Sequence, residues 1–318
     1  MKFPFALLLF AASLAAHAQD YPNRPIRLVV PYPPSGLTDV LGRVIADRLG
    51  NAFKQPVVVE NKPGAGTLLG AEIVARSPAD GYTLLVATST TLGISPALYK
   101  SPSIDPVRDF APVAWFGSVN FFLVAAPSFP AKNLRELIDE VRRNPGRYNY
   151  ASSGNGSPHH LFMEVFKTEL GLQMQHVPYK GTLFALPDIM SGKVEMMFLD
   201  ATAAVPNIQG GKINGLGTSA ARQTVLIPSI LPVADTVPGF DWQAWQGVVA
   251  PAGTPKPVIA KLSAEFQRWQ NQPEFREQLV KFGMEPAPPT TPEQFTEIVR
   301  GDVGRWAAAV KASGAKID

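Results

Sequence analysis

Short, almost continuously apolar runs recur along most of this chain and predict buried strands. They lie at residues 26–30, 57–59, 83–87, 121–125, 148–151, 194–198 and 247–250. Runs of this length with little polar alternation are typical of parallel sheets that are covered on both faces.

Amphipathic stretches separate and follow these runs and predict helices. In residues 39–49, apolar side chains recur at the i, i+3 and i+4 spacing of one buried face. The same spacing predicts helices at residues 134–141, 160–170, 184–190, 257–270, 273–282 and 292–313. The last three begin at or near a proline, which is favoured at the first position of a helix. Strands that alternate with helices predict α/β domains with mainly parallel sheets.

The order of these elements indicates two domains. We expect residues 19–125 and 222–318 to form one discontinuous α/β domain, because the C-terminal helices need the N-terminal unit as a packing surface. Residues 126–221 carry a strand and helix series of their own and are expected to form an inserted α/β domain. Ligands of such folds bind beyond the carboxyl ends of strands, in a crevice between domains.

The first residues predict a secretory signal peptide. Met1 and Lys2 precede an apolar run that reaches Ala16, and the chain then reads Ala16-His17-Ala18. The run is shorter than the roughly 20 residues that span a bilayer, so a membrane anchor is not expected. We therefore expect residues 1–18 to be removed after Ala18, leaving a soluble protein in a bacterial periplasm.

Composition narrows the possible chemistry. The chain of 318 residues has no cysteine, which excludes disulfides, thiolate catalysis and cysteine-ligated metals. Its net charge is only +3 and the basic residues are scattered, so we expect no nucleic-acid partner. Gly64-Ala65-Gly66 lacks the full dinucleotide fingerprint, and the adjacent His159 and His160 point to different helix faces. We expect neither a cofactor nor a metal.

The loop after the first predicted strand, residues 31–39, runs directly into a helix. Gly36 allows close approach to the backbone, and Thr38 or Asp39 is expected to cap the helix. The free amides at such a helix start bind an anion, so a carboxylate there needs no arginine. An ordinary capped loop is the alternative, and the loop alone does not decide between them.

A second loop, residues 151–160, has the same character. It follows the strand that ends near Tyr150, and it is rich in serine and glycine. Small residues and hydroxyls allow backbone N–H groups to converge on an anion. Two such loops, one in each domain, would face each other across a cleft and suit a ligand with two polar ends.

A hydrolase is the catalytic alternative. Ser35 or Ser153 would be the nucleophile and His160 the base. The chain has no G-x-S-x-G elbow, and no acid is obviously placed to orient the histidine. We therefore do not expect an enzyme.

Seven motifs, taken together in this order, resemble one known family. They are Tyr21–Ile26, Val59–Gly66, Pro78–Leu85, Gly156–Leu161, His176–Gly181, Trp245–Gly247 and Ala250–Pro255, and a closing Gly314 follows. The chain is similar over nearly its whole mature length to the periplasmic binding proteins of tripartite tricarboxylate transporters, also called the Bordetella uptake gene family.

The resemblance implies a two-domain periplasmic-binding-protein fold of type II, the Venus-flytrap, with the ligand in the cleft between its domains. Ligand carboxylates are held by backbone amides, hydroxyls and bridging waters. Carried over, the first loop supplies Tyr32, Pro34, Ser35, Gly36, Leu37, Thr38 and Asp39. The second loop supplies Ser152, Ser153, Gly154, Asn155, Gly156, Ser157 and His160. Thr88, Ser89, Tyr179, Lys180 and Gly181 would line the cleft.

Asp200 matches an acidic position of the family near the site. It would read an amino or hydroxyl group of the ligand, or cap a turn. Two departures from the family pattern affect the ligand's identity. Ser35 replaces the first of two paired glycines, and Phe184 stands where small residues are frequent.

The resemblance implies a receptor that captures a small carboxylate, closes, and delivers it to the membrane permease of a tripartite transporter. The closed form is also expected to suit a sensor kinase as partner. A chain that has lost its ligand and serves only as a partner-binding module is a third possibility. We expect a monomer, because the two domains must open freely.

Overall fold

The structure is a computed structural model that describes residues 21–315. The predicted signal peptide, residues 1–18, lies outside the described residues. Within residues 21–315, no helix is both long enough and apolar enough to cross a membrane.

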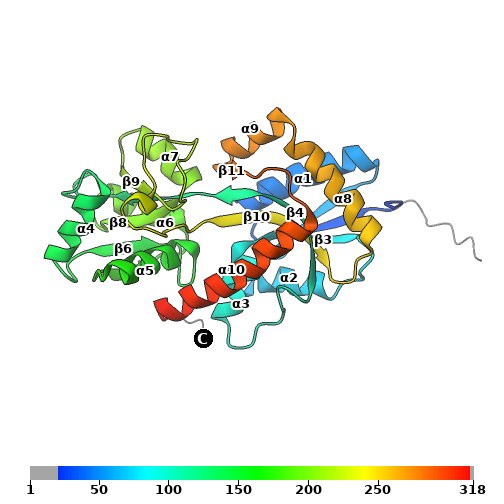
Figure 1. The fold of residues 1–318 in the computed structure, drawn as a ribbon, viewed down its shortest axis with the longest axis horizontal. Coiled ribbons are helices and arrows are strands. Elements are labelled where there is room, and N and C mark those ends of the chain that lie inside the picture. The colour runs from blue at the N-terminus through cyan, green and yellow to red at the C-terminus, as the bar shows by residue number, and fades with distance from the viewer. Residues whose placement is uncertain (1–20, 316–318) are drawn as a thin grey trace, which may run out of the picture.

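Two sheets form two lobes that lie side by side (Figure 1). The first sheet has six strands in the order β11-β4-β10-β3-β1-β2. Their bounds are β1 Ile26–Val30, β2 Val57–Asn61, β3 Thr83–Thr88, β4 Phe110–Val119, β10 Ala244–Pro251 and β11 Met284–Pro286. The second has five strands in the order β7-β6-β8-β5-β9. These are β5 Phe121–Ala125, β6 Asn149–Ser152, β7 Gln175–Pro178, β8 Met196–Asp200 and β9 Asn214–Thr218.

Helices cover both sheets (Figure 1). The first lobe carries α1 Leu37–Phe53, α2 Leu68–Ala75, α3 Ser95–Leu98, α8 Lys256–Gln270, α9 Pro273–Lys281 and α10 Pro292–Ser313. The second carries α4 Leu134–Arg143, α5 Pro158–Leu170, α6 Thr182–Met190 and α7 Ala201–Gln209. Short turns of helix occur at η1 Ala65–Thr67, η2 Thr90–Ile94 and η3 Val233–Asp235. The predicted α/β class is confirmed.

Both sheets are mixed, which corrects the expectation of mainly parallel sheets. β1 pairs in parallel with β2 and β3, but β10 is antiparallel to both β3 and β4. In the second sheet β5 is antiparallel to β8 and β9. The connections explain this, because β4 carries the chain out of the first lobe and β10 carries it back. Two neighbouring strands that cross in opposite directions must pair antiparallel.

The sheet that each strand joins indicates where the two domains divide. The predicted boundary kept residues 121–125 in the first domain, but these residues form β5, the strand between β8 and β9 in the second sheet. After β9, Ile227 and Ile230 are still buried in the core of the second lobe. We therefore propose that the second domain runs from Asn120 to about residue 243, where β10 begins.

The C-terminal helix α10 links the two lobes. It starts beside the first sheet and runs to α5 of the second lobe (Figure 1). Trp306 on α10 stacks on Phe162 of α5, with ring centroids 5.7 Å apart and planes 13° apart. The ring centroids of Trp242 and Trp306 lie 5.2 Å apart. One hydrophobic core therefore continues from lobe to lobe through these rings.

Candidate functional site

A cleft of about 450 Å³ opens between the two lobes. Its walls are the loops that follow β1, β3, β6, β7 and β8, together with the two crossing strands β4 and β10. The carboxyl ends of strands from both sheets therefore meet at one place, as the sequence predicts for this fold class.

The first loop presents the start of α1 to the cleft through Gly36, Leu37 and Thr38. Gly36 is the residue before the helix, and no side chain caps the helix there. This corrects the expected cap by Thr38 or Asp39, because both residues lie inside the helix and bond elsewhere. The first N–H groups of α1 have no acceptor within the helix and are free to bind a ligand.

Asp39 lies behind this loop and fixes its shape. One carboxylate oxygen accepts from the Ser35 amide at 2.9 Å, and the other accepts from the Asn61 amide at 2.8 Å. Arg43 donates to both oxygens. Burial alone would raise the pKa of Asp39, but these bonds hold it below its ordinary value. Both oxygens of Asp39 are thus occupied by hydrogen bonds that hold the loop, and Asp39 does not line the cleft.

Replacing Asp39 by asparagine tests this role. One amide cannot satisfy Arg43, Asn61 and the Ser35 N–H together, so we expect unfolding free energy to fall by about 1 kcal/mol. Urea denaturation measures the change. The exchange Asp47→Asn on the same helix is the control and should leave stability within about 0.5 kcal/mol; equal effects of both would contradict the role given to Asp39.

The second loop presents Ser153 and Ser157 to the cleft. Ser157 caps α5: its hydroxyl oxygen accepts from the His160 amide, and its hydroxyl donates to the Gly154 carbonyl at 2.7 Å. Gly156 adopts a φ of 71° and packs against Leu98 of the first lobe. A Cβ at this position would lie 2.3 Å from a Leu98 methyl, so a glycine allows the lobes to approach closely here.

The two neighbouring histidines have different surroundings. His159 lines the cleft, with Nδ1 2.8 Å from the Ser153 hydroxyl and Nε2 3.4 Å from Asp200. His160 turns away from the cleft and stacks on His176, with ring centroids 3.9 Å apart. Its Nδ1 accepts from the Gly156 amide at 3.1 Å. His160 therefore supports the loop from behind, and His159 is the histidine that faces the cleft.

Asp200 caps α7 and reaches the cleft from the second lobe. Its Oδ1 accepts from the Ala203 amide and the Thr202 hydroxyl, and its Oδ2 faces His159 and the Thr182 hydroxyl. Burial would raise the pKa of Asp200, but its hydrogen bonds with His159, Thr202 and the amide lower it instead. The carboxylate is therefore ionised and already surrounded by donors.

The charges that border the cleft come mainly from helix dipoles. In the described part of the chain, none of its lining residues is a lysine or an arginine, and its ionisable side chains are Tyr32, His159 and Asp200. Burial raises the pKa of Tyr32, so its phenol stays neutral. The starts of α1, α5, α6 and α7 all contribute lining residues. An uncapped helix start, as at α1 and α6, carries roughly half a positive charge, which favours a bound carboxylate, whereas the Asp200 carboxylate already offsets the dipole of α7.

The predicted site residues divide between the cleft wall and its support. Those that line the cleft are Tyr32, Gly36, Leu37, Thr38, Thr88, Ser89, Ser153, Ser157 and Asp200. Those that do not are Pro34, Ser35, Asp39, Ser152, Gly154, Asn155, Gly156, His160, Tyr179, Lys180 and Gly181. Several of the second set hold the first in place: Ser152, for example, bonds His176 at 2.6 Å.

Other lining residues were not predicted from the sequence. They include Thr90, Val119, Phe121, Pro158, His159, Thr182, Thr202, Ala244, Trp245 and Gln246. Gln246 is the most informative of them. Its Nε2 donates to the Thr38 hydroxyl at 3.1 Å, while its Oε1 is buried without a partner among the described residues. The motif Trp245-Gln246-Gly247 was the available signal.

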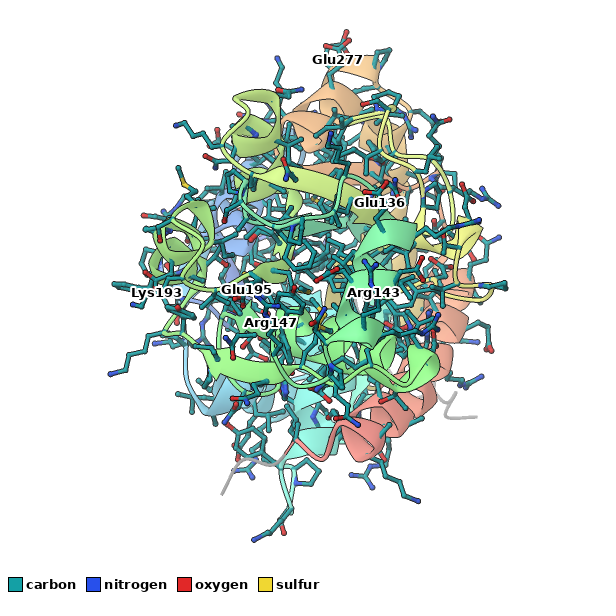
Figure 2. The ribbon with its side chains drawn as sticks, turned by 90° about the vertical axis from the view of Figure 1, so that its left-hand side faces the viewer. Glu136, Arg143, Arg147, Lys193, Glu195 and Glu277 are labelled. Atoms are coloured by element: carbon teal, nitrogen blue, oxygen red, sulfur yellow. The ribbon has the colours of Figure 1, made fainter. Side chains whose placement is uncertain are left out.

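The described residues form other hollows besides this cleft. A larger hollow of about 630 Å³ lies between α8 and α10, but a single lobe forms it, so closure of the lobes would not enclose it. Figure 2 views the end of the second lobe, where Arg143, Arg147 and Lys193 are interspersed with Glu136 and Glu195. Among residues 21–315, no group of histidine and carboxylate side chains is arranged to hold a metal.

Comparison with known proteins gives consistent matches. A sequence profile described as tripartite tricarboxylate transporter family receptor matches residues 41–315. BugT of Bordetella pertussis is 32% identical over 315 residues, which cover 98% of this chain and 96% of BugT. The structure of Rpa4515 of R. palustris with adipate matches with a TM-score of 0.82 and 31% identity, covering 94% of this chain and 100% of that one. MatC of Rhodopseudomonas palustris with bound malate matches with a TM-score of 0.76 and 32% identity, covering 91% and 100%.

Proposed function

Because this chain belongs to the tripartite tricarboxylate transporter receptor family, we propose that it is a receptor that encloses a small dicarboxylate between its two lobes. The family consists of periplasmic receptors for small carboxylates, and the sequence resemblance to it is confirmed. The ligand-binding residues are the members of both loops that line the cleft, joined by Gln246 and His159.

One observation carries the proposal: the uncapped starts of α1 and α6, one from each lobe, border a cleft whose lining, among the described residues, contains no lysine or arginine. Backbone N–H groups at helix starts bind carboxylates without a charged partner. They are contributed by both lobes, so a ligand with two anionic ends contacts both at once. Such a ligand stabilises the closed arrangement by its difference in affinity for the closed and open forms.

The partners and the location follow from the same proposal. We infer that the mature protein works in the periplasm after cleavage behind Ala18, that it is a monomer, and that its closed form docks on the membrane permease of a tripartite transporter. A sensor kinase is a further partner for the closed form. No cofactor enters this function.

A thermal-shift screen of the mature protein tests the receptor. The probes are adipate, malate, succinate and citrate, and the control for each is its neutral diamide or triamide. A ligand at about 100 times its dissociation constant stabilises the fold by roughly 2.7 kcal/mol. We expect a rise in melting temperature with at least one dicarboxylate and none with its amide. No shift with any acid would overturn the proposal.

Thr38 provides a test of the first loop. The change Thr38→Val keeps the shape of the side chain, removes the hydroxyl, and leaves the Gln246 amide without its acceptor at the cleft wall. We expect dicarboxylate affinity to fall about tenfold, the effect of losing one hydrogen bond in a charged site. Titration calorimetry measures it. Thr296→Val on α10, outside the cleft, is the matched control and should bind like the wild type.

A hydrolase has one observation in its favour, which is the row Ser153, His159, Asp200 in the cleft. His160, the base expected from the sequence, faces the other way and contacts neither Ser35 nor Ser153 among the described residues. Incubation with chromogenic esters of dicarboxylic acids distinguishes the two functions. The receptor predicts no release above the buffer rate; turnover that disappears in Ser153→Ala would establish the hydrolase.

A further inference from the structure

Three polar side chains form a continuous row on the second-lobe wall of the cleft. The Ser153 hydroxyl lies 2.8 Å from Nδ1 of His159, and Nε2 of the same ring lies 3.4 Å from Oδ2 of Asp200. Both ring nitrogens therefore have a partner. Ser153 and His159 both border the ligand space, and the His159 side chain is only 10% exposed.

The protonation state of His159 decides which way the Ser153 hydroxyl donates. Neutral His159 donates from Nε2 to Asp200, so its Nδ1 accepts and the Ser153 proton points at the ring. The Ser153 oxygen then offers the cleft only lone pairs, which repel a carboxylate. In the imidazolium form Nδ1 donates to Ser153, and the Ser153 proton is free to point into the cleft.

The groups that surround the His159 ring come from three elements of the second lobe and from the opposite wall of the cleft. The edge of Phe121 from β5 packs against the imidazole, with centroids 5.0 Å apart, and the Thr182 hydroxyl of α6 lies 3.4 Å from Nε2. Asp200 is the charged group that contacts the ring, and Tyr32, across the cleft, is the other ionisable lining residue. The Thr202 hydroxyl and the Ala203 amide donate to Oδ1 of Asp200 and hold its carboxylate beside Nε2.

We propose that capture of a dicarboxylate by this cleft takes up one proton, which His159 holds, and that Ser153 then donates its hydroxyl proton to the ligand. This inference rests on the proposed function and adds its coupling to pH. A carboxylate bound beside Ser153 places a second negative charge near Asp200, and nearby negative charge favours the charged form of histidine. Proton uptake and ligand binding then strengthen each other by the same factor.

The inference also concerns selectivity. A ligand that ends in a donor, such as an amide or a hydroxyl, matches the neutral ring, because Ser153 then offers an acceptor. A ligand that ends in a carboxylate matches the imidazolium. The cleft is therefore expected to prefer the diacid over its half-amide increasingly as pH falls.

Titration calorimetry of the mature protein with adipate, malate and succinate tests this. At one pH, the observed heat is compared between buffers of different ionisation enthalpy, which gives the number of protons taken up. We expect a value approaching one proton per ligand at one or more pH values between about 5 and 8. Within that window, the dissociation constant should rise by up to about tenfold per pH unit.

Three variants locate the proton. His159→Gln keeps a donor toward Asp200 but holds no charge, so uptake should fall to near zero and the pH dependence should flatten. Asp200→Asn retains a good helix cap for α7 while removing the negative partner, and it should lower uptake in the same way. Thr296→Val on α10, outside the cleft, is the control, and uptake should persist in it.

A second readout does not depend on the variants folding. The described chain contains His159, His160 and His176, and the NMR signal of the His159 ring should move to the imidazolium position when a dicarboxylate is added near neutral pH. Binding without proton uptake and without this movement would overturn the inference and leave the receptor intact. If none of the three acids binds, the proposed function fails and the inference falls with it.

Discussion

Replacing Trp306 by alanine is expected to lower the free energy of unfolding by about 3–5 kcal/mol, the usual cost of truncating a buried large aromatic residue. Trp306 is 1% exposed and stacks on Phe162 of the other lobe. It also covers Gly93, where an added Cβ would lie 2.4 Å from the indole ring. The truncation thus leaves a cavity at the junction that joins α10 to α5.

Urea denaturation, followed by tryptophan fluorescence and by circular dichroism, measures this effect. Trp306→Phe is the graded control, because a phenyl ring keeps the stacking on Phe162 and should cost less than the alanine. We also expect the two probes to separate in the alanine variant, because the lobes lose part of their shared core. A loss below about 1 kcal/mol would mean that the junction carries little of the stability.

Acidification from about pH 7 to pH 4.5 is expected to destabilise the fold by roughly 2 kcal/mol. Burial is the main reason that the pKa of His176 falls from 6.5 to about 4, and the adjacent His160 lowers it further. The pKa of His160 is also lowered, again mainly by burial. Both rings are therefore neutral in the folded protein at neutral pH.

The sign follows from the protons that each state binds. Between the ordinary histidine pKa and the lowered one, the unfolded chain binds a proton that the folded chain does not. Stability from the buried rings is complete above about pH 6.5 and decreases as pH falls toward 4. The expected loss of unfolding free energy is smaller than the pKa shifts alone would give, because His176 is only half-buried and solvent screens its interactions.

Urea midpoints at several pH values between about 7 and 4.5 measure the loss, and a variant of His176 separates its share from that of carboxylates, whose ordinary pKa values of about 4 overlap the lower end of this range. His176→Gln should show a weaker dependence on pH, because glutamine does not titrate. An equal slope in wild type and variant would assign the loss to other groups.

The sequence predicted those strands best whose two faces are both apolar. β1 and β5 were predicted with their observed bounds, and β3 and β10 were placed within a few residues. β4 was missed because Pro112 and Gly117 interrupt its apolar pattern, and both residues are unusual inside a strand. β9 was missed because Gly215 and Gly217 interrupt its apolar pattern. The structure shows why they are there: a Cβ at either would lie within 3 Å of Ile230 or Val233.

The site could be predicted as two loops, because each follows a strand and opens a helix. The contacts of individual side chains could not be predicted from the sequence, because they depend on how the elements pack. His159 and His160 are adjacent in sequence, and only the packing of α5 decides that the first faces the cleft and the second the His176 ring. Gln246 reaches Thr38 from a strand that returns to the first lobe more than two hundred residues later, a contact that local patterns do not encode.

The lack of lysine and arginine in the lining of the described cleft has a consequence for the medium in which the receptor works. Attraction between mobile side-chain charges and a free anion is screened by dissolved salt, over about 10 Å at moderate ionic strength. Salt also screens helix dipoles that face water, but their effect is confined to the first turn, and contacts buried in a closed cleft are screened much less. Such a receptor gains little long-range electrostatic steering of its ligand. Its affinity should therefore change little when the salt concentration around it rises or falls.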